Sequence, residues 1–269
     1  MKEATVDSST RGFLERNPVF TTAEFQLALP PGTPRSTMLN RLLQAYRRGY
    51  TERIGRGVYA SRIGTFMEEP PDPFLVASRL ATDYVVASHS ALEAHGVAHI
   101  PFRRVTFLSA RTPFEVAYRG HEFLALRPAA SMVADGTWRV SVVQLRRGNH
   151  LISATSRERT LVDCLNHLKW AGGLEELLRS VGGFPSLSME GLLAYLDLLD
   201  SPSTVAKVGW VLSAEPDLWR VTSSELEALQ SRLGKGPYFL SPRDKPKSLV
   251  REWRLYVPAD LDPGEVLRG

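Results

Sequence analysis

The chain has 269 residues, a hydrophobic content of 43% and a formal net charge of +4. This composition excludes a globally disordered chain, and the single cysteine, Cys164, excludes a disulfide framework. The N-terminus lacks the apolar core of a signal peptide, and no stretch is apolar enough to span a membrane. We therefore expect a cytoplasmic protein with no membrane partner.

The positive charge is concentrated near the N-terminus. Residues 1–65 contain ten Lys or Arg and five Asp or Glu, whereas the remainder contains 23 basic and 24 acidic residues. Between residues 35 and 62 there are seven arginines and one acid, Glu52. Such a cluster is typical of a surface that binds a polyanion, with a merely solvated basic surface as the alternative.

Two short helices are predicted first. The segment STRGFLERNP indicates a helix that ends before Pro18. In FTTAEFQLAL, Thr21 and Glu24 have the spacing of a capping box, and Phe20 and Phe25 have that of a hydrophobic staple.

A third helix is predicted from Pro34 to about Arg48, with Thr33 as its cap and Gly49 at its end. Its apolar residues recur at helical spacing and form a stripe that consists of Met38, Leu39, Leu42, Leu43 and Tyr46. Its polar side chains are short polar groups and arginines, which suit base edges and phosphates. These candidate DNA-binding residues are Arg35, Ser36, Thr37, Asn40, Arg41, Gln44, Arg47 and Arg48.

Two strands are predicted next, YTERI and GVYAS, with a GRG turn between them. Three helices followed by a hairpin are the order of a winged helix-turn-helix, which we predict for residues 1–67. Arg53 and Arg56 of the hairpin are added to the DNA-binding candidates, and Arg56 is expected at the tip of the wing.

The proline-rich segment EEPPDP, residues 68–73, is predicted to be a linker. Residues 74–269 are predicted to form a second domain, in which strands come first and helices follow, so the fold class is α+β. Two helices precede the strands, the second with Ser88 as its cap and Gly96 at its end, and the strands are expected to form an antiparallel sheet. The helical part begins at a cap on Thr155 or Ser156 and ends at Gly234, and strand-like segments close the chain.

No catalytic, cofactor or metal site is predicted. His89, His95 and His99 lie close together, but helix-ending Gly96 separates the last two, so a structural turn is favoured over zinc. Cys164 is expected in the core. Glu158 and Asp163 are five residues apart and do not share a helix face, while Arg159 can pair locally.

Several modules together carry a family resemblance. The chain resembles the AbiEi antitoxins through an N-terminal region ending in GRGVYA, through YVVASHSALEAHGV, through ISATSRERTLVDCL and through EWRLYVP. This resemblance implies a repressor that binds inverted repeats in its own promoter. It also implies that the second domain neutralises a nucleotidyltransferase-like toxin of the AbiEii type.

Two alternatives stay open. One is a winged-helix transcriptional regulator whose second domain senses a ligand or partner and is not linked to a toxin. The other is an enzyme with a DNA-targeting module, for which the sequence shows no convergent titratable groups.

Overall fold

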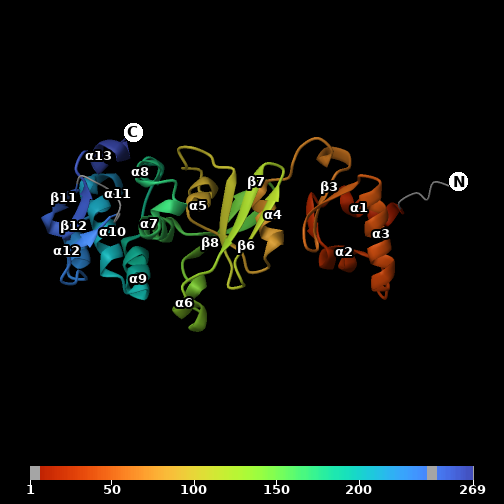
Figure 1. The fold of residues 1–269 in the computed structure, drawn as a ribbon, viewed down its shortest axis with the longest axis horizontal. Helices are drawn as coiled ribbons and strands as arrows, with labels where there is room; N and C mark the ends of the chain where they lie inside the picture. The colour runs from red at the N-terminus through yellow and green to blue at the C-terminus, as the bar shows by residue number, and fades with distance from the viewer. Residues whose placement is uncertain (1–6, 241–246, 269) are drawn as a thin grey trace. The chain divides into compact units, whose positions relative to one another are not determined.

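The computed structural model describes residues 7–240 and 247–268. The chain divides into two compact units, of which unit 1 comprises Met1–Tyr84 and Arg103–Arg127 and unit 2 comprises Val85–Phe102 and Pro128–Gly269. Each unit combines helices with strands (Figure 1), so the predicted α+β class is confirmed.

Unit 1 begins with six short elements. They are α1 (Ser8–Leu14), β1 (Val19–Thr21), α2 (Thr22–Ala28), α3 (Arg35–Arg47), β2 (Thr51–Gly55) and β3 (Val58–Ser61). The three strands form an antiparallel sheet in the order β1-β3-β2. Strand β1 was not predicted, because it is only three residues long and its last residue, Thr21, is also the N-cap of α2.

The N-termini of α2 and α3 differ in how they are capped. At α2 the predicted capping box is confirmed: the Thr21 hydroxyl accepts from the Glu24 amide at 3.1 Å, and Glu24 accepts from the Thr21 amide at 2.7 Å. At α3 the predicted cap is wrong. The helix begins at Arg35, so its N-cap position falls on Pro34, whose side chain has no group that could accept a hydrogen bond. The Thr33 hydroxyl donates to the Pro30 carbonyl at 2.6 Å within the preceding turn.

A small aromatic core holds these elements together. Its buried members are Phe13, Leu14, Phe20, Phe25, Leu29, Met38, Leu42, Ala45 and Ile63. The rings of Phe20 and Phe25 lie 6.0 Å apart, which confirms the predicted staple around the cap of α2. The core thereby fixes α2 against the start of β1 and leaves one side of α3 to solvent.

The predicted apolar stripe of α3 is only partly buried. Met38 and Leu42 pack in the core, together with Ala45, which the stripe did not include. Leu39, Leu43 and Tyr46 are 45%, 44% and 52% exposed. The rest of the unit therefore covers only part of the apolar face of α3.

After the 3-10 helix η1 (Gly64–Phe66), four further helices and strands complete unit 1. They are α4 (Pro73–Leu80), β5 (Arg104–Leu108), β6 (Phe114–Tyr118) and β7 (His121–Leu126). β7 pairs antiparallel with β6 and parallel with β5, so the expectation of a purely antiparallel sheet is wrong. Hydrophobic alternation is the same in both directions of pairing, so the sequence pattern could not distinguish them.

Residues 68–72 contain neither helix nor strand, and α4 begins at Pro73. However, α4 belongs to the same compact unit as the N-terminal elements, and Arg79 Nε lies 2.9 Å from Glu24 Oε1. The compact units are therefore not divided at this segment. The division into domains 1–67 and 74–269 stays a prediction.

Unit 2 contains the remaining strands and most of the helices. Its elements are β4 (Val85–Val86), α5 (His89–Ala94), α6 (Ala130–Ala134), β8 (Val142–Arg147), β9 (His150–Thr155), α7 (Arg157–Asn166), α8 (Leu174–Gly182), α9 (Met189–Leu199), α10 (Pro202–Ala214), α11 (Pro216–Trp219), α12 (Ser223–Gln230), β10 (Tyr238–Phe239), β11 (Lys247–Val250), β12 (Leu255–Pro258) and α13 (Pro263–Arg268). β9 pairs with β4 in parallel and with β8 in an antiparallel hairpin. β12 pairs in parallel with β10 and antiparallel with β11.

Two predicted N-caps and one predicted helix C-terminus lie in unit 2, and their outcomes differ. Ser156 caps α7 through the Arg159 amide, as one of the two predicted alternatives. Ser88 precedes α5 but makes no side-chain cap, because its backbone has a positive φ of 56°. α12 ends at Gln230, before the predicted Gly234. Within the described residues, no helix has the length and apolarity that crossing a membrane requires.

Candidate nucleic-acid interface

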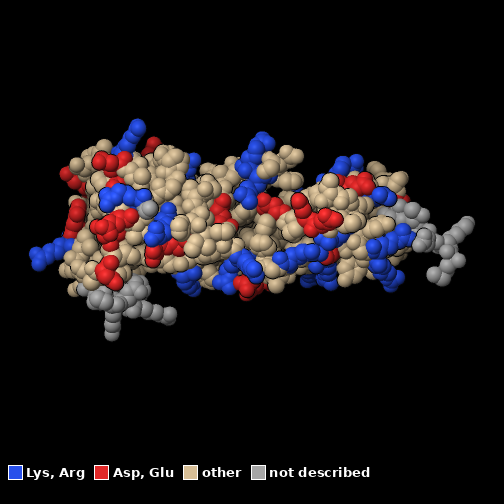
Figure 2. Space-filling model, turned by 90° about the horizontal axis from the view of Figure 1, so that it is seen from above, with Lys and Arg blue, Asp and Glu red and all other residues tan. Residues whose placement is uncertain are grey.

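The predicted DNA-binding side chains lie on α3 and on the β2–β3 hairpin. Most of them are exposed: Arg35, Ser36, Asn40, Gln44, Arg47, Arg53 and Arg56. Three are partly buried: Thr37, Arg41 and Arg48. Figure 2 shows Lys and Arg side chains gathered along the lower edge of the right-hand part of the view, where the N-terminal elements lie.

Arg41 forms an ion pair within the protein. Its Nη1 lies 2.6 Å from Asp7 Oδ2, and Asp7 is the N-cap of α1. Burial opposes the charged form of Asp7, but hydrogen bonds from Thr10 and Ser9 and the charge of Arg41 outweigh it and lower the pKa of that carboxyl. Arg41 thereby links α3 to the beginning of α1.

The hairpin turn is narrow and firmly anchored. Gly55 pairs with Val58, which leaves Arg56 and Gly57 at the turn. Gly57 has a φ of 72°, a conformation that favours glycine, and its carbonyl accepts from the Thr22 amide at 2.9 Å. The tip that carries Arg56 is therefore attached to the first residue of α2.

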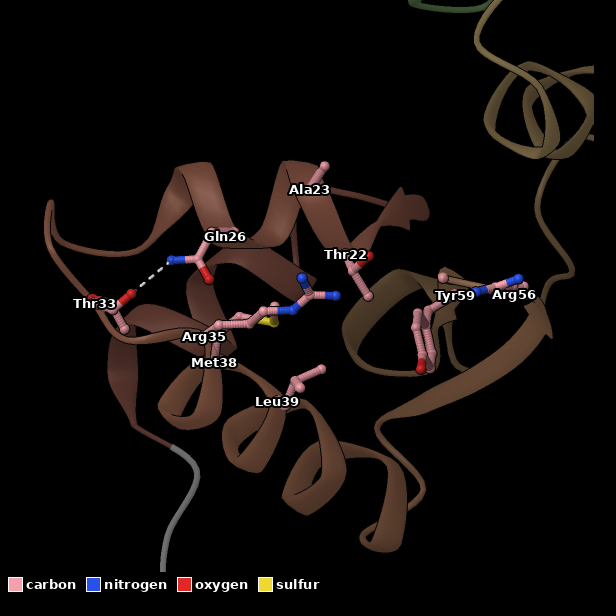
Figure 3. Close-up of a pocket in the computed structure, with 10 residues that line it drawn as sticks. Thr22, Ala23, Gln26, Thr33, Arg35, Met38, Leu39, Arg56 and Tyr59 are labelled. Atoms are coloured by element: carbon pink, nitrogen blue, oxygen red, sulfur yellow. Dashed lines mark hydrogen bonds between the residues drawn. The ribbon is translucent and has the colours of Figure 1, made fainter.

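An open pocket of about 790 Å³ lies between α2, α3 and the hairpin (Figure 3). Its lining residues are Thr22, Ala23, Gln26, Thr33, Arg35, Met38, Leu39, Arg56, Gly57 and Tyr59. In Figure 3 the Arg35 side chain extends across the pocket towards Thr22, whereas the guanidinium of Arg56 points away from Leu39.

A second open pocket of about 390 Å³ continues along α3. It is lined by Leu39, Asn40, Leu42, Leu43, Tyr46, Arg53 and Tyr59. Leu39 and Tyr59 line both pockets, so the two adjoin. Together they are called the groove between α3 and the hairpin.

Sequence reasoning missed part of this groove. Thr22, Ala23 and Gln26 of α2 and Tyr59 of β3 line it, although none was a candidate. No motif near these residues in the sequence predicts binding, because only the packing of α2 and β3 against α3 brings them to the groove. Leu39, Leu43 and Tyr46 were assigned to the apolar stripe, and only their exposure shows that they line the groove as well.

Glu52, the one acid within the arginine cluster, is held away from the groove arginines. The Tyr118 hydroxyl and Arg119 Nε each donate to its Oε2 at 2.9 Å, and Arg62 Nε lies 3.8 Å from its Oε1. The hydrogen bond from Arg119 lowers the pKa of Glu52. The burial of Tyr118 and its hydrogen bond to Glu52 raise the pKa of the Tyr118 hydroxyl to about 12.

Four cationic side chains remain without such a partner. In the described part of the chain, the guanidinium groups of Arg35, Arg47, Arg48 and Arg56 make no hydrogen bond or ion pair with another residue. Arg53 Nε donates to its neighbouring Gly55 carbonyl at 3.2 Å. The positive charge of α3 and the hairpin is therefore available to an external anion.

The polar clusters of unit 2 serve its own packing. His89 is 2% exposed, and its two ring nitrogens lie 3.1 Å from Glu93 Oε1 and 3.0 Å from Glu176 Oε1. Its ring stacks on Phe102 with centroids 3.7 Å apart. His95 Nε2 donates to the Thr155 carbonyl at 2.8 Å. Of the described residues, no three His, Cys, Asp or Glu side chains form a group that could hold a metal ion.

The RERTLVD segment forms most of α7 and contacts several neighbouring elements. Arg159 is 1% exposed and donates to the carbonyls of Trp138 and Val140 at 2.7 and 2.6 Å. Asp163 accepts from the Tyr195 hydroxyl at 2.7 Å, although its burial raises the pKa of the carboxyl. Cys164 is buried as expected, and burial also raises the pKa of its thiol.

Comparison with solved structures gives a distant structural likeness. No protein-family model and no curated protein matches the sequence. The crystal structure of the RV2827C protein from Mycobacterium tuberculosis is similar with a TM-score of 0.60 and 14% sequence identity. The match covers 93% of this chain and 90% of that one. At this identity the likeness shows a shared fold alone.

Proposed function

We propose that residues 1–67 form a winged helix-turn-helix that binds duplex DNA. The order helix, strand, helix, helix, strand, strand and the sheet order β1-β3-β2 support this proposal. In it, α3 enters the major groove, and the β2–β3 hairpin is the wing that contacts the flanking backbone.

One observation carries the proposal: four arginines of α3 and the hairpin are exposed, namely Arg35, Arg47, Arg53 and Arg56, while Glu52 is bound by other residues. Arg119 and Tyr118 bind Glu52, so it does not neutralise Arg35, Arg47 or Arg56. Unpaired guanidinium groups on one helix and an adjacent turn suit phosphates, which they contact through planar, charge-assisted hydrogen bonds.

The resemblance to AbiEi antitoxins extends the proposal. The DNA would be the protein's own promoter, with inverted repeats as the operator, and the remainder of the chain would neutralise an AbiEii-like nucleotidyltransferase toxin in the cytoplasm. This is a binding function and needs no catalytic residue or cofactor. A regulator unlinked to any toxin would share the DNA-binding surface but would not rescue cells from the toxin.

A salt titration of the full chain on its own promoter fragment tests DNA binding. Each phosphate that the protein neutralises should contribute about −0.9 to the slope of log affinity against log salt concentration. Arg146→Ala is a suitable control, since it removes an exposed arginine from β8 in unit 2 and should leave the slope unchanged. Absence of binding at low salt would refute the proposal.

The antitoxin part has its own test. The chain is co-expressed with an AbiEii-like nucleotidyltransferase toxin, and growth is scored against cells that produce the toxin alone. Restored growth supports an antitoxin. Promoter binding without any restoration supports the regulator that is unlinked to a toxin.

A further inference from the structure

The outer surface of α3 is not uniformly polar. Leu39, Leu43 and Tyr46 expose about half of their side chains in the middle of the most basic part of the chain. Exposed apolar groups that lie together on a surface mark a site of contact. Contacts between the arginines and phosphates do not explain why these three apolar side chains are exposed.

The leucines lie among the side chains that would contact DNA. Leu39 and Leu43 share a pocket with Asn40 and Arg53, and Leu39 also shares a pocket with Arg35 and Arg56. Positions 36, 39, 40 and 43 are neighbours on the helix surface, because residues three and four apart share a face. An occupant of this surface must therefore present apolar groups directly beside negative charge.

Duplex DNA meets both conditions at one kind of base pair. Its phosphates supply the negative charge, and the C5-methyl group of thymine is the apolar group on the floor of the major groove. The paired adenine presents N6 and N7 on the same edge, which an asparagine can bind through two hydrogen bonds. Asn40 is exposed and lies directly after Leu39.

We propose that Leu39 and Leu43 contact thymine methyl groups in the major groove, so that the protein recognises A·T pairs where α3 lies against the bases. This inference rests on the proposed DNA-binding function and specifies what α3 reads. The apolar side of the groove then contributes sequence specificity, whereas the arginines contribute affinity for any duplex.

The test uses the full chain and removes methyl groups from the DNA. A binding sequence is first selected from a pool of random duplexes. Each thymine in that sequence is then replaced in turn by deoxyuridine, which lacks only the C5-methyl group. At one or more positions the affinity should fall about fourfold, the effect of losing one buried methyl group.

Leu39→Ala and Leu43→Ala then assign the contact. Each variant should bind the thymine duplex more weakly, and the deoxyuridine effect should disappear at the position that the missing leucine contacts. Leu151→Ala, which removes a 60% exposed leucine from β9, is the matched control and should keep the full deoxyuridine effect. A thermal melt of each variant confirms folding, and the wild-type measurement with deoxyuridine does not depend on any variant.

The outcomes separate the two proposals. If no duplex binds at low salt, the DNA-binding function itself is wrong. If duplexes bind but deoxyuridine is neutral at every position, the methyl contact is wrong and DNA binding stands. If the protein alone forms a dimer that Leu43→Ala dissociates, a second copy covers the leucines and the methyl contact is likewise wrong.

Discussion

At the residue scale, the partner of each charged side chain decides what that side chain can bind. Glu52 lies between Arg48 and Arg53 in sequence, yet in the fold it binds Arg119 and Tyr118. Arg41 lies among the polar residues of α3, yet it pairs with Asp7. The charges left available are thus those of Arg35, Arg47, Arg48 and Arg56, which make no such contact with a described residue.

Arg35 and Arg41 should therefore respond differently to substitution. Arg35→Ala should weaken DNA binding and make the salt slope about 0.9 less steep if the guanidinium contacts one phosphate. Arg41→Ala should keep the slope and lower the free energy of unfolding by about 0.2–1 kcal/mol, since it loses a partly exposed ion pair. Salt titration and urea unfolding measure the two effects. An equal change of slope in both variants would contradict this assignment.

His89 makes the stability of unit 2 depend on pH. Burial opposes the charged imidazole, but the hydrogen bonds and charges of Glu93 and Glu176 outweigh burial and raise the pKa of His89. The stabilisation is fully present below the unfolded pKa of about 6.5 and is lost as pH rises through the higher pKa of the folded state. Glu176, whose pKa is lowered, loses its contribution only in acid, below about pH 4.5.

We expect the melting temperature of the wild-type protein to fall between pH 6.5 and 9 by more than that of His89→Gln. His95 and His167 do not mask this difference, because their pKa values are lowered and their contributions change below pH 6.5. Thermal melts of both proteins across this pH range measure the effect. Parallel curves would mean that His89 is not charged in the folded protein.

At the scale of elements, the hairpin and α2 form one structural feature. The Gly57 carbonyl accepts from the Thr22 amide, so the turn that presents Arg56 is oriented by the start of α2. The capping box of Thr21 and Glu24 fixes that start in turn. The position of the proposed wing therefore depends on the helix before it as well as on its own two strands.

Gly57→Ala should disturb this feature. The residue has a φ of 72°, and a Cβ atom there would lie 3.2 Å from Thr22 Oγ1. A left-handed conformation costs a non-glycine residue about 1–2 kcal/mol, so the melting temperature should fall. Gly12→Ala is the matched control: it lies within α1 with room for a Cβ, and the change should stabilise the helix by about 0.5–1 kcal/mol. Equal effects of the two substitutions would contradict the argument.

At the scale of the whole molecule, the compact units do not follow the order of the chain. The sequence changes unit after Tyr84, after Phe102 and after Arg127. The strands β5, β6 and β7 thus belong with the proposed DNA-binding region, and the last residue of β6, Tyr118, and the next residue, Arg119, bind Glu52. Truncation at the proline-rich segment would remove these partners, so substitutions in the full chain are the better way to separate functions.

The triple variant Arg35→Ala, Arg47→Ala, Arg56→Ala should lose promoter repression but still restore growth in the presence of the toxin. The three side chains have no described partner within the protein, so their loss should leave the fold intact. A promoter-reporter assay and co-expression with the toxin measure the two functions in parallel. Loss of both functions in a variant with an unchanged melting temperature would mean that DNA binding and neutralisation share these residues.

Much of the local structure was determined by the sequence itself. The capping box at Thr21, the cap at Ser156 and the helix end at Gly49 follow from short-range hydrogen bonds and from backbone preferences, which depend on neighbouring residues alone. The charge excess of the first 65 residues is likewise a property of composition. The candidate arginines were predicted from this charge excess and the third helix, and the α+β class from the order of strand-like and helical segments.

Only the tertiary structure decided which residues are buried, paired or free. Leu39 and Leu42 carry the same side chain three residues apart, yet one is 45% and the other 3% exposed, because other elements cover one arc of α3. The parallel pairing of β5 with β7 and the binding of Glu52 by Tyr118 and Arg119 arise in the same way. Contacts between residues distant in sequence carry no local signal, so the groove, its apolar side and its unneutralised charge became visible only in the folded chain.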